Sequence, residues 1–334
     1  MLNEFRRDLV SGEWVLFATG RSRTLVPKSR YESYQPKEDC PFEDGRIREQ
    51  EIVWGYPNEK DWRMMLIKNK FPAVRPTVYE PLHQVGPFDI QTATGDHEII
   101  VFRDHEKGFD DFSREEIVEA VKAYKRRHQE LADNKEHNRY SMVFHNHGRE
   151  AGASIYHAHS QIISTPILPP DVFHSITGSS LYYTNHNKRV YDVLLEWETK
   201  EKKRIVHENE HFLVFCPFVS KYPYEMRIFS KESHAHFERM PDAMDPFFAD
   251  AIYTAVQKMK IVLQRPPFNF FIHSAPIDIA GKNEFGPGIH EFYQWHMEII
   301  PHLKIDAGFE IGTGIEVNVV DPDEAAAALR AAKI

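Results

Sequence analysis

The chain has 334 residues, 42% of them hydrophobic and 27% charged, so it can bury a core of about two domains and is not a wholly disordered protein. Its 41 basic and 50 acidic side chains give a net charge of -9, and without a dominant basic face the sequence predicts no nucleic-acid partner. The 2 cysteines cannot form a disulfide framework, the N-terminus lacks the apolar segment of a signal peptide, and no run of about 18 apolar residues could cross a membrane, so a cytoplasmic protein without membrane contact is expected.

Short apolar runs separated by proline-containing loops predict strands in the first half of the chain. Ser113 followed by Glu116 is a capping-box pattern, so a helix is expected over about 114–133. The predicted strands lie at residues 8–18, as a pair, and at 64–69, 97–102, 141–148 and 154–164.

The second half repeats this order, with a helix predicted over 242–264. When the strand at 97–102 is aligned with the strand at 224–230, His159 falls on His296. The chain is therefore predicted to be an α+β protein built from two similar repeats, with a mainly antiparallel sheet and one helix per repeat packed on it. The strands predicted in this half lie at 211–218, 224–230, 268–276 and 292–303.

The most informative motif is the run His157-Ala158-His159-Ser160-Gln161. Side chains alternate between the faces of a strand, so His157, His159 and Gln161 are expected to point to one side. The preceding Gly152 and Ser154 would let backbone N–H groups and a hydroxyl approach a phosphate. An imidazole can attack phosphorus if an acceptor holds its other nitrogen, but two histidines so spaced are more often structural or metal-binding.

The longer pattern N-x-G-x-x-x-G-A-S-x-x-H-x-H-S-Q at 146–161 resembles the nucleotidyl-transfer motif of the galactose-1-phosphate uridylyltransferase family, a branch of the histidine-triad superfamily. The resemblance covers nearly the whole chain. It implies two tandem histidine-triad-like domains, here residues 1–188 with the nucleophile and residues 189–334. Further segments with family counterparts are 5–23, 40–45, 69–74, 97–105, 223–234, 293–303 and 307–314.

The resemblance also implies a mechanism. His159 would attack the α-phosphorus of a nucleoside diphosphate substrate, and a second phosphate-bearing substrate would then accept the nucleotidyl group. Gln161 would bind the transferred phosphate and, since a carboxamide is no general acid, would favour transfer over hydrolysis. The family's phosphate contacts match Asn146, Gly152 and Ser154, and residues near the nucleotide match Arg21, Arg23 and Asn69.

Many family members hold zinc with two cysteines and two histidines. The matching positions here are Cys40, Glu43, His105 and His157, with Glu43 in place of the second cysteine. A carboxylate can bind zinc, so the resemblance implies a structural zinc site with four protein ligands.

Some members have a second metal site, built from three histidines and a glutamate that follows the nucleophile. His273 and His296 match two of these histidines, but Gln294 stands in the third position. No glutamate follows His159 at the usual distance. This second site is therefore predicted to be empty.

The segment after the last predicted strand contacts the hexose in the uridylyltransferases and reaches into the partner subunit, so a homodimer is implied. Lys304, Phe309 and Glu310 match hexose-binding positions, although Phe309 could instead pack in the core. A glutamine expected shortly afterwards is replaced by Glu316, which leaves the sugar open.

Three functions are consistent with these residues. The leading one transfers UMP between UDP-glucose and a hexose 1-phosphate. The second transfers an adenylyl group to phosphate, as an ADP-glucose phosphorylase or an adenylylsulfate:phosphate adenylyltransferase (ADP sulfurylase) does. The third is a non-catalytic nucleotide-binding protein, which the intact His159 and Gln161 argue against.

Overall fold

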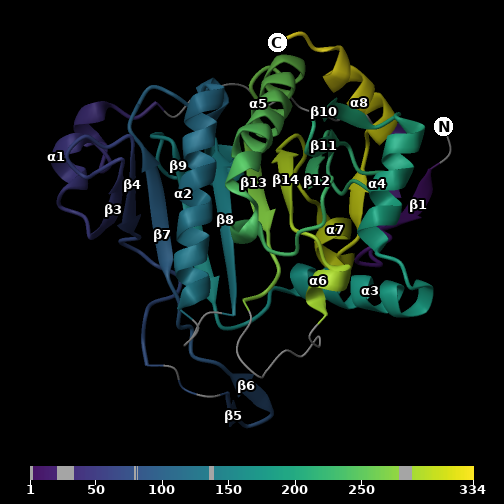
Figure 1. Cartoon of the computed structure of the whole chain (residues 1–334), viewed down its shortest axis with the longest axis horizontal. Helices are drawn as coiled ribbons and strands as arrows, with labels where there is room; N and C mark the ends of the chain where they lie inside the picture. The colour runs from purple at the N-terminus through teal and green to yellow at the C-terminus, as the bar shows by residue number, and fades with distance from the viewer. Residues whose placement is uncertain (1–2, 21–33, 79, 81, 135–138, 278–287) are drawn as a thin grey trace.

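The computed structural model describes residues 3–20, 34–78, 80, 82–134, 139–277 and 288–334 (Figure 1). Its centre is a 10-stranded sheet in which every neighbouring pair is antiparallel. In spatial order the strands are β10 (Ile205–Glu208), β11 (Phe212–Phe215), β12 (Met226–Ser230), β14 (His296–Pro301), β13 (Phe268–His273), β8 (Tyr140–His147), β9 (His159–Thr165), β7 (His97–Phe102), β4 (Met64–Lys68) and β3 (Ile52–Tyr56).

The strand order is symmetric about the central pair of β8 and β13. From the centre outward, β8, β9, β7, β4 and β3 of the first half correspond to β13, β14, β12, β11 and β10 of the second half. This arrangement confirms the predicted α+β fold and its repeated order of elements. The two repeats share one continuous sheet.

One long helix from each repeat packs on the same face of this sheet (Figure 1). They are α2 (Arg114–Asp133) and α5 (Asp245–Val262), which contact each other. Helix α2 begins where predicted, because the Ser113 hydroxyl accepts from the backbone N–H of Glu116 and the Glu116 carboxylate accepts from the backbone N–H of Ser113. The buried side chains of both helices fill one apolar core with the sheet residues beneath them, and the opposite face of the sheet carries the candidate site.

Two further helices, which the sequence did not predict, connect the repeats. They are α3 (Pro170–His186) and α4 (Val190–Glu201), and the predicted boundary between residues 188 and 189 falls in the turn between them. The separation of the chain into 1–188 and 189–334 stays a prediction. Among the described residues, none of the helices combines the length and the apolar character needed to cross a bilayer.

The remaining elements are small. A three-stranded sheet joins the two ends of the chain, since β2 (Trp14–Phe17) pairs with β1 (Glu4–Arg7) and with β15 (Glu316–Asn318). The short hairpin is β5 (His83–Val85) and β6 (Phe88–Ile90), and the other helices are α1 (Asp44–Ile47), α6 (Ile289–Phe292), α7 (Gly308–Thr313) and α8 (Pro322–Ala331). Among the described residues, 3-10 helices include Lys37–Asp39, Phe109–Asp111, Arg149–Ala151, Phe237–Arg239 and Asp242–Met244.

Candidate active site and metal centre

A loop of small residues connects β8 to β9. Gly148 and Gly152 both have positive φ angles, of 85° and 88°, which residues other than glycine rarely adopt. A Cβ at Gly148 would also lie 3.0 Å from the Cβ of Pro267. Glycine is therefore needed at both turns for the loop to fold back over the end of the sheet.

The predicted strand over 154–164 is wrong at its start, because β9 begins at His159. Pairing with β7 resumes only where the backbone N–H of Phe102 donates to the carbonyl of Ala158, at 3.2 Å. Residues before that point bend out of the sheet. His157 thus lies in the loop, and it does not share an extended strand with His159 and Gln161.

A pocket of about 850 Å³ lies between this loop and the turn that precedes β13. Four of the predicted catalytic and phosphate-binding residues line it, namely Asn146, Gly152, Ser154 and His159. Its other lining residues include His145, His147, Tyr156, His157, Arg265 and Pro267. The structure therefore brings together the predicted nucleophile and the predicted phosphate contacts.

His159 is oriented by its own backbone. Its Nδ1–H donates to the carbonyl of His157 at 2.9 Å, so the lone pair is left on Nε2. The residue is only 6% exposed, and burial lowers its pKa, so the ring is neutral at pH 7. A neutral imidazole with a free Nε2 in a pocket is the form that can act as a nucleophile.

Asn146 is held by a residue that the sequence reasoning missed. The amide of Asn269, on β13, donates to Oδ1 of Asn146 and to the carbonyl of Ala151, both at 2.8 Å. The Asn146 Nδ2 group is thereby left for the pocket, and an ideal Cβ on Gly152 would lie 3.6 Å from it. Nothing in the local motif points to Asn269, which lies 123 residues away in sequence.

Gln161 lies on the same face of β9 as His159, two residues further along. Neither Gln161 nor Asn69 is among the described residues that line the pocket. The two are linked instead through His97, whose Nε2 is 2.9 Å from Oε1 of Gln161 and 3.2 Å from Nδ2 of Asn69. The predicted Arg21 and Arg23 lie outside the described residues.

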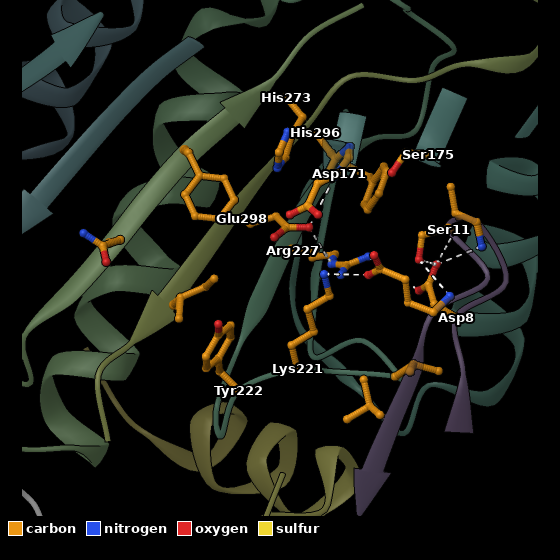
Figure 2. A pocket seen from close by; sticks show the side chains of 18 of the residues that line it. Asp8, Ser11, Asp171, Ser175, Lys221, Tyr222, Arg227, His273, His296 and Glu298 are labelled. Carbon is orange, nitrogen blue, oxygen red and sulfur yellow. Dashed lines mark hydrogen bonds and ion pairs between the residues drawn. The ribbon is translucent and has the colours of Figure 1, made fainter. Parts of the chain in front are cut away.

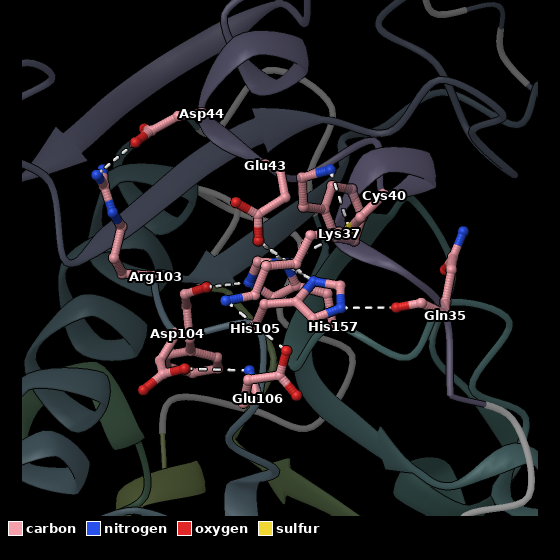
Figure 3. Close-up of polar contacts among 12 residues, drawn as sticks. Gln35, Lys37, Cys40, Glu43, Asp44, Arg103, Asp104, His105, Glu106 and His157 are labelled. Atoms are coloured by element: carbon pink, nitrogen blue, oxygen red, sulfur yellow. Dashed lines mark hydrogen bonds and ion pairs between the residues drawn. The ribbon is translucent and has the colours of Figure 1, made fainter.

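Cys40, His105 and His157 place their ligand atoms together (Figure 3). Sγ of Cys40 lies 3.4 Å from Nδ1 of His157, and the two Nδ1 atoms lie 3.3 Å apart. Oε1 of Glu43 is 3.2 Å from Nδ1 of His105 and 3.8 Å from Nδ1 of His157. Three of the four residues named from the sequence thus form one cluster, and Glu43 lies beside its two histidines.

The donor set of this cluster fits a metal ion. Nε2–H of His105 donates to the carbonyl of Gln35 at 2.7 Å, and Nε2–H of His157 donates to the carbonyl of Phe102 at 2.5 Å. Both rings therefore direct an unprotonated Nδ1 into the cluster. The two nitrogen lone pairs repel each other there, and a bound cation would remove that repulsion. The separations of Nδ1 of His157 from Sγ of Cys40 and from Nδ1 of His105, 3.4 and 3.3 Å, agree with the edges of a tetrahedron with metal–ligand bonds of about 2.0–2.3 Å, which are roughly 3.3–3.8 Å.

Burial sets the charge state of these groups. It lowers the pKa of His157 to about 4 and raises the pKa of the Cys40 thiol. His157 is therefore neutral at pH 7, as a metal ligand must be. The Cys40 thiol, in contrast, needs a bound cation to become the thiolate that binds zinc.

Comparison with known proteins agrees with this geometry. Residues 4–169 match the family described as galactose-1-phosphate uridyl transferase, N-terminal domain, and residues 90–332 match a domain of unknown function. The ADP-glucose phosphorylase of Arabidopsis thaliana is 30% identical over 335 residues, which cover 98% of this chain and 92% of the relative. The chain belongs to the galactose-1-phosphate uridylyltransferase family. It is therefore a nucleotidyltransferase enzyme, as the sequence predicted.

One further relative and one solved structure span the full length. The galactose-1-phosphate uridylyltransferase of Thermotoga maritima is 27% identical over 341 residues, which cover 99% of both chains. The crystal structure of an ADP-glucose phosphorylase from Arabidopsis thaliana with bound ADP-glucose superposes with a TM-score of 0.83 and 27% identity, covering 100% of both chains. The resemblance read from the motifs is thus confirmed for the family.

A second pocket, of about 310 Å³, lies between the sheet of the second repeat and the N-terminal segment around Asp8 and Glu13 (Figure 2). His273 and His296 lie in it, and Glu298, which the sequence reasoning did not consider, places its carboxylate with them. Gln294 takes no part, since its amide donates to the carbonyl of Ser230 at 2.6 Å.

The carboxylate of Glu298 is already neutralised by a cation. Its Oε1 is 3.0 Å from Nε of Arg227 and 3.4 Å from Nε2 of His296. Burial alone would raise the pKa of Glu298, but Arg227 and the histidine reverse this and hold it well below its usual range. With Arg227 bound to the carboxylate, the cluster fits a dedicated metal site less well than the Cys40 cluster does. The absence of metal from this second cluster stays a prediction.

The predicted acceptor-binding residues are not among those that line the pocket at His159. The ammonium of Lys304 binds the carboxylates of Glu316 and Asp306. Glu316, which stands where the family has a glutamine, therefore neutralises the charge of this lysine. Glu310 accepts from the backbone N–H of Ala307 at the start of α7. Phe309 is 46% exposed, so the alternative that it packs in the core of this chain is wrong.

Proposed function

We propose that this enzyme transfers a nucleotidyl group through a covalent intermediate on His159. Nε2 of His159 attacks the α-phosphorus of a nucleoside diphosphate sugar, the N–P bond forms, and the bond to the bridging oxygen breaks to release the sugar 1-phosphate. An oxygen of the second phosphate-bearing substrate then attacks the same phosphorus, and the N–P bond breaks. The observation that carries this proposal is the hydrogen bond from Nδ1 of His159 to the carbonyl of His157, because it leaves Nε2 as the nucleophilic atom.

The surrounding residues suit a phosphoryl group. Asn146 offers its Nδ2 group, Gly152 opens the loop for close approach, and Ser154 lines the same pocket. Gln161 supplies a carboxamide, which donates to phosphate oxygens but cannot protonate a leaving group. The site therefore favours transfer to a phosphate acceptor over hydrolysis.

We expect ping-pong kinetics. Since the first product leaves before the acceptor binds, double-reciprocal plots at several acceptor concentrations should be parallel. Labelled glucose 1-phosphate should exchange into the donor when no acceptor is present. Intersecting plots together with the absence of exchange would show direct transfer in a ternary complex and would make His159 a binding residue.

Two donor and acceptor pairs fit this mechanism. ADP-glucose with phosphate is supported by the 30% identity to an ADP-glucose phosphorylase and by the neutralised Lys304 in the segment expected to bind hexose. UDP-glucose with a hexose 1-phosphate is supported by the full-length similarity to a uridylyltransferase. Adenylylsulfate is a third donor that the motif allows.

Intact-mass measurement separates these donors. The enzyme is incubated in turn with ADP-glucose, UDP-glucose and adenylylsulfate; the mass of the nucleotidyl adduct identifies the base, and the donor that forms the adduct identifies the leaving group. We expect the adduct with ADP-glucose to form at least about tenfold faster than with UDP-glucose, since about 1.4 kcal/mol of difference in the transition state suffices for that ratio. Faster formation of a uridylyl adduct would instead support the uridylyltransferase function.

We further propose a structural zinc ion held by Cys40, Glu43, His105 and His157. Four protein ligands leave no open position, so the ion would order the segment around Cys40 and the loop before β9 without touching substrate. His157 then has two roles, since its ring would bind the ion while its carbonyl holds His159.

We also propose that the enzyme is a homodimer. Three apolar side chains on the segment after β14 are exposed, with relative exposures of 77% for Ile305, 46% for Phe309 and 77% for Ile311. Such a group of exposed apolar side chains on one segment is typical of a surface that another chain covers.

A further inference from the structure

His97 joins two motifs that lie far apart in the sequence. It is the first residue of β7, it contacts Gln161 on the neighbouring strand β9, and it contacts the turn at residues 69–74. Its Nδ1 is 3.0 Å from the backbone nitrogen of Ala73, and its Nε2 is 2.9 Å from Oε1 of Gln161. The chain thus surrounds both ring nitrogens with fixed groups.

These contacts determine which nitrogen carries the proton. The backbone N–H of Ala73 can only donate, so Nδ1 of His97 must be the unprotonated nitrogen that accepts from it. A neutral imidazole has one N–H, which is therefore on Nε2 and donates to Oε1 of Gln161. The reverse orientation of the Gln161 amide would set its NH₂ group against this N–H, with two donors facing each other.

The same reasoning fixes Asn69. Its Oδ1 accepts from the backbone N–H of Phe71 at 2.9 Å, so the atom near His97 is its amide nitrogen. That nitrogen and Nε2 of His97 both carry hydrogen, and their 3.2 Å contact is not a hydrogen bond. Among the described residues no group accepts from the amide nitrogen of Gln161, and so two carboxamide NH₂ groups are left on the face of the sheet that carries His159.

We propose that His97 is a positioning residue for nucleotidyl transfer. It holds the Gln161 carboxamide with its NH₂ group, and not its carbonyl oxygen, available to the anionic oxygens of the transferred phosphoryl group. Ala73 keeps His97 in the tautomer that this requires. The inference rests on the proposed function, because it assigns Gln161 to the phosphoryl group, but it concerns a residue that lies outside the nucleophile pocket.

A carboxamide held in one orientation has an electrostatic advantage. A free carboxamide can turn over by a half-rotation at little cost, and the turned form would direct an oxygen at a phosphoryl oxygen. A fixed N–H donor to a developing charge needs no reorganisation during the reaction. Loss of His97 should therefore slow the transfer step more than it weakens nucleotide binding.

A double-mutant cycle tests this role. The rate of adduct formation in a single turnover and the affinity for donor nucleotide are measured for the wild type, His97→Ala, Gln161→Ala and the double variant. We expect His97→Ala to slow adduct formation about 10- to 100-fold, with less than about a threefold change in nucleotide affinity. In the Gln161→Ala background, His97→Ala should slow adduct formation by less than about threefold.

A conservative pair of variants separates positioning from packing. His97→Gln keeps an N–H donor in reach of Gln161, so it should form the adduct at least about tenfold faster than His97→Ala does. His97→Leu offers no donor and should be as slow as His97→Ala. Thermal unfolding of each variant shows whether it is folded. The proposal would be overturned if His97→Ala slowed adduct formation equally in the wild type and in Gln161→Ala, or if His97→Gln and His97→Leu formed the adduct at equal rates. Either result would leave the covalent mechanism in place. Failure of the wild type to form any adduct would overturn the proposed function itself, and with it the phosphoryl role of Gln161.

Discussion

Replacing His159 with alanine is expected to lower turnover at least about 10⁴-fold and to abolish the covalent nucleotidyl adduct. In the proposed mechanism the imidazole is the nucleophile of the first half-reaction and the leaving group of the second, and its Nδ1–H is held by the carbonyl of His157. The remaining pocket would still bind the nucleotide, so the affinity for donor should change far less than the rate. The measurements are steady-state turnover, intact mass after incubation with donor, and nucleotide binding.

The second repeat supplies a matched control for this variant. His296 occupies the corresponding place on β14, and its Nδ1 also faces the carbonyl two residues earlier, that of Gln294, at 3.3 Å. It differs in its surroundings, since Glu298 and Arg227 lie beside it where the nucleophile has Gln161. His296→Ala should therefore keep adduct formation. If the adduct persisted in His159→Ala and disappeared in His296→Ala, the nucleophile would lie in the second repeat and our proposal would be wrong.

The elements that the sequence predicted correctly are those with strong local signals. The apolar strands and the capped helix α2 each follow from a few neighbouring residues. Helix α3 was missed because glycine, serine and threonine make its sequence a poor helix former. It is stabilised by tertiary packing of Val172 and Ile176 beside Val10, and at Gly178 an added Cβ would lie 1.9 Å from the carbonyl oxygen of Val10.

The same distinction applies to the candidate site. His159, Gly152 and Ser154 belong to one contiguous motif, so the sequence alone could bring them together. Asn269 and His97 lie on other strands, and their contacts with Asn146 and Gln161 depend on the strand order and register. No local pattern marks either residue, because each acts by orienting the amide of another residue.

The zinc proposal predicts that removal of one ligand eliminates the metal and destabilises the fold. Purified wild type should contain about one zinc per chain, and Cys40→Ala should contain less than about a tenth of that, because the thiolate is the strongest donor of the set. An ion present at about 1,000 times its dissociation constant stabilises the folded state by about 4 kcal/mol. For a chain of this length that corresponds to a loss of about 5 °C in Tm. Elemental analysis and thermal unfolding give the two values.

The chain offers its own control and a converse test. Cys216 is the other cysteine, equally buried but packed in the main core, so Cys216→Ala should lower Tm through lost packing while keeping its zinc. A chelator should lower the Tm of the wild type and of Cys216→Ala, and should leave Cys40→Ala unchanged. Glu43→Cys replaces a half-exposed carboxylate with a thiolate and should hold zinc against a higher chelator concentration than the wild type does. Equal zinc content in Cys40→Ala and the wild type would mean that the ion binds elsewhere.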